Sequence, residues 1–250
     1  MVPQYPIYEF PRELLQPEKN RFFIGRRHLL SAQPWTAYMR VQGPVDERWV
    51  TKFSVANYQP DEWSRLEALM NRMDGQAGFV TAFDPARIYP RGSATGPTPR
   101  TLGFPAGQPF SDGSYFSDGS GFVDVSPHIY VAAASYKGSD LVCVSGLKPN
   151  SAVAMAENDL LCITVGGLQW GYLHSVVADA ASDSAGFAVL RIRPRLRRAV
   201  VAGDLVRIHH PTGVFSLSSE EDTQVERSYP LLGSFGCTLI EAPEVIEVLL

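Results

Sequence analysis

Residues 176–211 read VVADAASDSAGFAVLRIRPRLRRAVVAGDLVRIHHP, and the pattern in this stretch decides the fold of the chain. Residues 187–193 alternate between the two faces of an extended chain and are rich in β-branched side chains, which favours a strand. Residues 200–208 supply the next strand across a Gly203–Asp204 turn. The stretch therefore predicts two β-hairpin arms with an arginine-rich strand end between them.

The arginines of this stretch follow the period of a strand. Four of them recur at every second position and would share one face of an extended segment: Arg191, Arg193, Arg195 and Arg197. Apolar side chains would point the other way: Leu190, Ile192 and Leu196. A fifth arginine, Arg198, follows, and the segment contains no catalytic group. This is the pattern of a barrel wall with a solvated outer face.

The chain around this stretch contains further short strands at near-regular spacing, which predicts a small closed or nearly closed β-barrel. The predicted strands are 129–134, 141–145, 160–165, 171–176, 188–192 and 205–208. Before them, residues 86–127 are rich in Gly, Pro and Ser and hold a near-repeat, FSDGS at 110–114 and 116–120. A calcium or glycan loop is one interpretation, but a pair of β-turns is favoured because Asp–Gly suits tight turns and the spacing does not match an EF-hand.

The first 85 residues predict a separate β-rich module. A proline-punctuated arm covers 1–16, and alternating strands follow at 35–42 and 48–56, joined by a Gly43–Pro44 turn. The only helix we predict begins at Gln59–Pro60 and stops at Gly75, and 78–83 returns to strand. Its buried face recurs at three and four residues: Trp63, Leu66, Leu69, Met70 and Met73.

Strand character returns after Pro211, at 214–217 and, beyond an acidic turn at 220–222, at 229–241. We therefore predict a mainly β fold in which 1–85 and 213–250 form a β-sandwich or barrel with one helix. Residues 86–212 would be an inserted small β-barrel domain that begins with the Gly/Pro/Ser-rich loop.

Composition excludes several classes of protein. The net charge of −4 argues against a surface that embraces nucleic acid. Cys143, Cys162 and Cys237 are widely spaced, which predicts neither a disulfide framework nor a zinc site. No signal peptide or membrane span is recognisable, so we expect synthesis in the cytoplasm.

The residues that could carry chemistry do not form a catalytic pattern. His209 and His210 are adjacent, so on a strand they point to opposite faces and cannot share a metal ion without a bend. Surface and turn histidines before Pro211 are the favoured interpretation. Asp179 and Asp183 flank Ser182 in a stretch of small residues, which favours a solvated turn over a glycosidase pair. No nucleophile elbow, P-loop or dinucleotide fingerprint occurs, so we predict no enzymatic activity, no metal site and no cofactor.

The arginine row permits two interpretations. An inserted small barrel with five arginines is compatible with an OB-like nucleic-acid binder, but few aromatic side chains on the same strands could stack on bases. Pairing with carboxylates of a neighbouring subunit suits so ordered a row better. The candidate inter-subunit contacts are Arg191, Arg193, Arg195, Arg197 and Arg198.

Two regions carry a resemblance to a known family. The motifs of the first region, 49–85, are a tryptophan-bearing strand, a helix with Trp63 and Leu66, MDGQAGF at 73–79 and FDP at 83–85. The motifs of the second region, 185–215, are AGF at 185–187, Arg193–Pro194, Gly203–Asp204 and HPTGVF at 210–215. Together they resemble the distal tail proteins of long-tailed bacteriophages and related gene-transfer particles.

The resemblance implies a structural virion protein at the tail tip. Members of that family form a hexameric ring that joins the tail tube to the baseplate hub, so the implied partners are further copies of the chain, the tube protein, and hub and other tail-tip proteins. Their first module is similar to the tube protein's β-sandwich with one helix, and they have no catalytic residues. They often append an extra β-domain at the C-terminus, whereas here that domain is predicted to be internal.

Two alternatives to a ring subunit stay open at this point. A receptor- or carbohydrate-binding tail module needs exposed aromatic side chains, for which Tyr115, Phe116 and Trp170 are the weak candidates. A tail-associated enzyme acting on cell wall needs an acid–base pair, which the sequence does not display.

Overall fold

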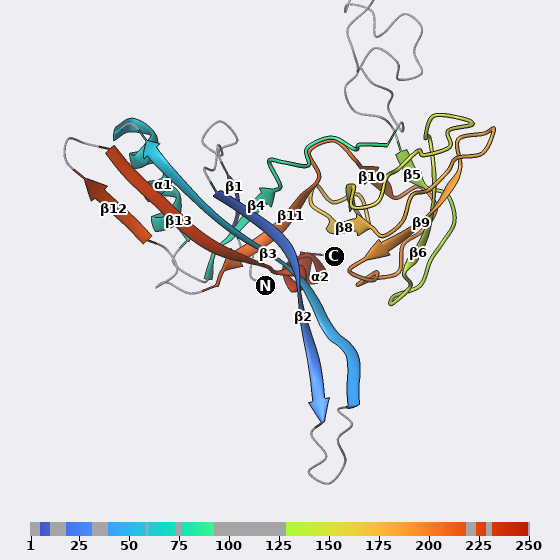
Figure 1. Ribbon diagram of the computed structural model, residues 1–250, viewed down its shortest axis with the longest axis horizontal. Helices are drawn as coiled ribbons and strands as arrows, with labels where there is room; N and C mark the ends of the chain where they lie inside the picture. Colours follow the sequence, from blue (N-terminus) through green and yellow to red (C-terminus); the bar gives the residue numbers. More distant parts are fainter. Residues whose placement is uncertain are drawn as a thin grey trace, which may run out of the picture. The chain divides into compact units, whose positions relative to one another are not determined.

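A computed structural model describes residues 6–10, 19–31, 40–58, 60–73, 77–92, 129–218, 224–228 and 232–249. The FSDGS repeat and the 86–127 loop beyond residue 92 lie outside the described residues. The chain divides into two compact units, one of 1–85 with 213–250 and the other of 86–212. Both units are mainly β (Figure 1).

The first unit is built on a seven-stranded sheet in the order β1-β4-β11-β13-β3-β2, with β12 also paired to β13. Its strands are β1 (Ile7–Glu9), β2 (Lys19–Ser31), β3 (Arg40–Tyr58), β4 (Phe79–Phe83), β11 (Thr212–Leu217), β12 (Gln224–Ser228) and β13 (Leu232–Glu241). Strand β13 pairs antiparallel with both β3 and β11, so strands from the end of the chain lie in the middle of the sheet. This pairing confirms that the segment after Pro211 completes the sheet of the first module.

The long hairpin of this sheet differs from the one predicted. Gly43–Pro44 is not a turn, because β3 runs through it from Arg40 to Tyr58 and pairs with β2, a strand that sequence reasoning missed (Figure 1). Pro44 lies opposite His28, where the register shifts on both sides of His28. Proline has no N–H for the ladder, and here an irregularity in the pairing accommodates it without a chain reversal.

Helix α1 (Pro60–Met73) confirms the predicted helix and its buried face. Leu66, Leu69 and Met73 are buried and Met70 is half-buried, whereas the side chain of Trp63 lies outside the described residues. The helix contacts β13, the partner of β3, so it covers the same sheet. On β3, the predicted inward face is buried at Trp49, Thr51 and Phe53.

Besides β2, three elements of this unit were not predicted: β1, β12 and α2. Residues 7–9 of the proline-punctuated arm form β1, which pairs parallel with β4 in the same sheet. A second helix, α2 (Pro243–Leu249), follows β13, so the expectation of a single helix was wrong. Pro243 at its first position and Glu244 in its first turn are ordinary helix-start signals.

The second unit contains a closed six-stranded barrel, which confirms the prediction from strand spacing. Its strands are β5 (Ile129–Val131), β6 (Leu141–Ser145), β7 (Leu160–Ile163), β8 (Tyr172–Val176), β9 (Ala188–Arg193) and β10 (Leu205–Arg207). Around the barrel they follow the order β10-β5-β6-β9-β8-β7. Closure leaves no unpaired strand edge in the barrel.

The register of the strands identifies the barrel interior. Val142 pairs with Leu190, Val176 with Ile192, and Val206 with both Ile129 and Ile163. These side chains are almost fully buried. Because side chains alternate across a strand, these residues and those two positions away on the same strands line the interior.

Candidate functional site

Strand β9 presents the first arginines on the outside of the barrel. Ala188, Leu190 and Ile192 are buried, while Val189 and Arg191 between them are exposed. The predicted division into an apolar inner face and an arginine-bearing outer face therefore holds along this strand.

The arginines do not all lie on one strand, although the predicted alternation of faces continues past its end. Strand β9 ends at Arg193 because Pro194 has no N–H to continue the ladder. The alternation nevertheless persists beyond it, since Leu196 is buried and held by hydrogen bonds between its backbone and residues 138 and 139. Arg195 and Arg198 are exposed, whereas Arg193 and Arg197 are half-buried.

The predicted hairpin across Gly203–Asp204 is also wrong. Strand β10 pairs with β5 and β7, and β9 pairs with β6 and β8, so the two strands are not neighbours. Val200 bridges Ser135, while Leu205 pairs with Tyr130, so the chain continues in one direction along β5. The tight turn, in which the Val201 N–H donates to the Asp204 carboxylate at 2.8 Å, interrupts this pairing and does not reverse it.

Asp140 and Arg191 form an ion pair on the outer surface. The Nε of Arg191 lies 3.2 Å from Oδ2 of Asp140, and the Asp140 carbonyl accepts from the N–H of Ile192 at 2.8 Å. Burial acts to raise the pKa of Asp140, but hydrogen bonds from Arg191 and its own backbone amide, and the charges of Arg191 and Arg193, lower it on balance. Arg191 is thus held in a defined direction on the sheet.

Behind the arginine segment, a histidine lies inside the barrel. His174 follows the inward register of β8 and is buried, and its Nδ1 lies 2.8 Å from the Pro194 carbonyl oxygen. A carbonyl only accepts, so Nδ1 carries the hydrogen, and no described residue hydrogen-bonds Nε2. Burial, opposed by the Pro194 hydrogen bond and assisted by the charge of Arg197, lowers the pKa of His174 from 6.5 to about 4. The ring is neutral at pH 7.

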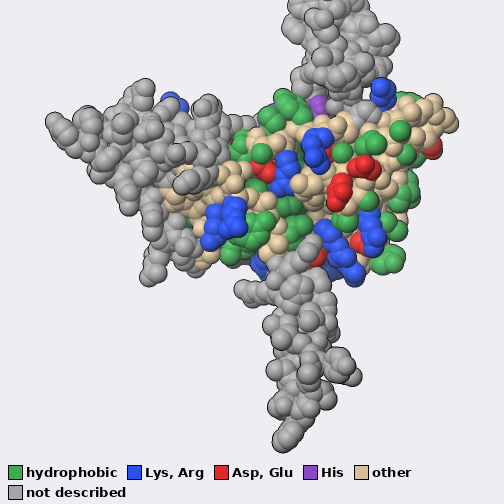
Figure 2. Space-filling view, in the orientation of Figure 1, with side chains coloured by type: hydrophobic (Ala, Val, Ile, Leu, Met, Phe, Trp, Pro, Cys, Tyr) green, Lys and Arg blue, Asp and Glu red, His purple; other side chains and the backbone are tan. Residues whose placement is uncertain are grey.

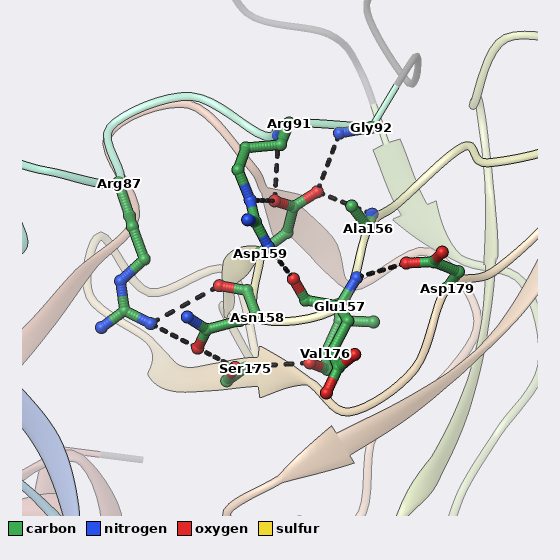
Figure 3. Close-up of polar contacts among 10 residues, drawn as sticks. All are labelled: Arg87, Arg91, Gly92, Ala156, Glu157, Asn158, Asp159, Ser175, Val176 and Asp179. Atoms are coloured by element: carbon green, nitrogen blue, oxygen red, sulfur yellow. Dashed lines mark hydrogen bonds and ion pairs between the residues drawn. The ribbon is translucent and has the colours of Figure 1, made fainter.

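A buried carboxylate anchors the segment that leads into the barrel (Figure 3). Asp159 accepts hydrogen bonds from the backbone N–H groups of Arg91 at 2.9 Å, Gly92 at 3.1 Å and Ala156 at 2.8 Å. The Nε of Arg91 also lies 3.6 Å from its Oδ1. Three backbone donors and one cation compensate for the burial of this charge, so Asp159 has a structural role.

The two ends of the second unit meet beside this anchor. Arg87 donates to the Asn158 side chain at 2.7 Å, as Figure 3 shows. The Ile88 carbonyl accepts from the N–H of His210 at 2.8 Å. An insertion with adjacent ends can interrupt another sheet without separating its strands.

Asp179 and Asp183 both act in loop structure. Oδ1 of Asp179 accepts from the Glu157 N–H at 2.7 Å. Oδ1 of Asp183 accepts from the N–H groups of Ala185 at 2.9 Å and Phe187 at 2.8 Å. These hydrogen bonds support the interpretation of a turn over that of a glycosidase pair.

The histidine pair lies in a bend before Pro211, as the favoured interpretation predicts, and both side chains are half-buried. His210 has φ 45°, so the backbone leaves the extended conformation at this residue. Both imidazoles contact the ring of Tyr89 edge-on, with centroids at 5.3 Å for His209 and 5.4 Å for His210. Within the described residues, no group of three His, Cys, Asp or Glu side chains could hold a metal ion.

Of the weak glycan candidates, the described residues include Trp170 alone. Trp170 is half-buried in the turn before β8, and Tyr115 and Phe116 lie outside the described residues.

Comparison with known protein families and with curated proteins finds no match to this sequence. In the described part of the chain, no helix has the length and apolar character needed to cross a membrane.

Sequence reasoning missed the apolar side chains beside the arginines. Leu141, Phe187 and Val189 are all exposed, and Val189 pairs with Cys143 across β6 and β9. The signal was present, because Phe187 and Val189 alternate with the buried Ala188 and Leu190. The outer surface therefore combines guanidinium groups, which bind carboxylates, with apolar area suited to a protein surface.

Proposed function

We propose that the chain is a structural subunit that assembles into a ring at the distal end of a phage-type tail. In this proposal the ring connects the tail tube to the baseplate hub and its fibres. Its partners are further copies of the chain, the tube protein and the hub proteins, and the subunit has no enzymatic activity. The motifs that resemble distal tail proteins and the mainly β first unit with its helix α1 support this assignment.

The observation that carries the proposal is the edge of the first unit's sheet. Strand β2 has 13 residues and, among the described residues, pairs only with β3. At the other edge stands β1, a three-residue strand paired with β4. Long unpaired edges invite pairing with another chain, and two different edges on one subunit are compatible with a head-to-tail contact that closes into a ring.

The side chains near the β2 edge suit a contact surface. Phe23 is 40% exposed, and the guanidinium carbon of Arg21 lies 6.0 Å from the centre of its ring. Aromatic and arginine side chains are enriched at protein interfaces. The arginines from 191 to 198 belong to the second unit and are proposed to contact carboxylates of another copy of the chain, separately from this edge.

Electron microscopy and sedimentation velocity of the purified chain test this function. We expect rings of uniform diameter, and we expect Phe23→Asp to reduce the ring population at least tenfold. Asn71→Asp is the control, because Asn71 is exposed on α1, a helix that contacts β13, and the variant adds the same charge away from Phe23. A strictly monomeric chain at high concentration, or equal loss of rings in both variants, contradicts the proposal.

A further inference from the structure

The barrel of the second unit carries an exposed apolar surface that the proposed ring contact does not use. We call this surface the β6–β9 face, and four large apolar side chains define it. They are Leu141, which is 48% exposed, Val177 at 37%, Phe187 at 43% and Val189 at 60%. In Figure 2, hydrophobic side chains reach the surface beside Lys and Arg side chains. A group of exposed apolar side chains on one sheet face marks a protein interaction site.

The register shows that these side chains lie on one surface. Leu141 pairs with Arg191 and Cys143 with Val189, across strands whose intervening residues fill the barrel interior. The N–H of Val177 donates to the Arg191 carbonyl at 2.8 Å, so Val177 continues the row on the other side of β9. The outer face of a barrel wall is normally polar, so the apolar positions here are not required by the barrel itself.

Charge is arranged oppositely at the two ends of this face. The exposed Asp183 lies at the start of β9, where its carboxylate accepts the Phe187 N–H at 2.8 Å. Arg191 and Arg193 lie at the other end of the strand, and the exposed Arg195 follows. Asp140 also lies at this second end, paired with Arg191, so the end is basic through the excess of Arg193 and Arg195. The face therefore has an apolar centre with an acidic end and a net basic end.

Such a surface is complementary to itself under a two-fold rotation. An axis through the centre of the face places the Asp183 end of one copy against the Arg193–Arg195 end of the other, while the apolar centres meet. A unidirectional arrangement would place arginine against arginine and carboxylate against carboxylate. We propose that the β6–β9 face binds the same face of a second copy of this chain. This contact is independent of the sheet edges proposed to close the ring.

The half-buried Cys143 provides a reporter for this contact. It lies at the centre of the face beside Val189, and the other two cysteines, Cys162 and Cys237, are buried. In the two-fold arrangement the two copies of Cys143 approach each other across the axis. A short bismaleimide added to the full-length chain should therefore link two copies through this residue.

The experiment combines cross-linking with sedimentation equilibrium. We expect the bismaleimide to give a covalent dimer that Cys143→Ser abolishes. We expect Val189→Glu to weaken the non-covalent dimer and reduce its cross-linking at least tenfold. Val201→Glu is the matched control, because Val201 is 58% exposed elsewhere on the barrel. This control should change the dimer affinity and the cross-linking yield by less than twofold. Arg195→Glu should weaken the dimer about fivefold, and raised salt should reduce this difference.

Several outcomes would overturn the inference. They are a chain that shows no association through the barrel, equal loss of the dimer in Val189→Glu and Val201→Glu, or unchanged cross-linking in Val189→Glu. Thermal unfolding of each variant confirms that it is folded, and Phe187→Glu repeats the test at a second position of the face. Rings that persist in Val189→Glu support two separate contacts, whereas two-fold dimers without rings would refute only the ring.

Discussion

His174 makes the stability of the barrel depend on pH. Its ring is neutral and buried, with a pKa lowered from 6.5 to about 4, chiefly by burial. The unfolded chain therefore binds a proton at this residue below pH 6.5, whereas the folded barrel resists binding it down to about pH 4. The stabilisation is fully present above pH 6.5 and is lost as the pH falls from 6.5 towards 4.

The magnitude follows from the two pKa values. Each unit of pKa difference corresponds to about 1.4 kcal/mol. Proton uptake by His174 in the unfolded chain should therefore lower the free energy of unfolding of the barrel by roughly 3 kcal/mol between pH 7.5 and 4. Carboxylates elsewhere in the chain also titrate in this range, so the effect must be measured as a difference between variants. His174→Asn is the suitable variant, because its amide can donate to the Pro194 carbonyl as Nδ1 does but does not titrate.

The assay is hydrogen exchange by mass spectrometry on full-length protein, read on peptides from β8 and β9 and corrected for intrinsic exchange rates. The wild-type barrel should lose roughly 3 kcal/mol of opening free energy, relative to His174→Asn, as the pH falls from 7.5 to 4. Peptides from β3 serve as the internal reference in the first unit. A difference between the two proteins that stays constant over this pH range would refute the reasoning.

Three further predictions follow from the packing and topology. Leu66→Ala should lower the free energy of unfolding of the first unit, measured in urea, by about 2 to 5 kcal/mol, because Leu66 is only 1% exposed. The control Asn71→Ala, at an exposed position of the same helix, should lower it by less than about 0.5 kcal/mol. Equally small effects in both variants would show that this face of α1 does not pack. Removing 214–250 deletes most of the central strands β11 and β13, so amide NMR should show an unfolded first unit and an intact barrel. Replacing 86–212 with a Gly-Ser linker should leave the first unit cooperatively folded. A dispersed spectrum from 1–85 alone would show that the first unit folds without the C-terminal strands. Asp159→Ala should leave three backbone N–H groups without their acceptor and lower the free energy of unfolding by about 2 to 4 kcal/mol, with faster amide exchange at Arg91 and Gly92. Asp159→Asn retains an acceptor oxygen, so it should lower the free energy of unfolding by less.

Local pattern was sufficient for much of the fold. The alternation around Leu190 and Ile192 predicted a barrel wall, because a residue's face on a strand depends only on its position in the sequence. The periodicity of Leu66, Leu69 and Met73 predicted α1 for the same reason. These predictions needed no information about partners.

Which strands pair with each other could not be predicted from local pattern. Gly43–Pro44 and Gly203–Asp204 have the composition of hairpin turns, yet the chain continues through both of them. The pairing with β2 and β5 is only locally irregular at these positions. Turn composition indicates that the chain can bend, and only the neighbouring strand decides whether it reverses.

The candidate sites divide along the same line. The sequence by itself determined which residues are available on the barrel wall, including the arginines from 191 to 198 and the apolar positions between buried residues of β9. Only the tertiary structure decided that Leu141 and Val177 join Val189 on one surface, that Asp183 and Arg195 lie at opposite ends of it, and that His174 is enclosed behind Pro194. These relations depend on contacts between residues far apart in the chain, whose register is set by the packing of the whole barrel.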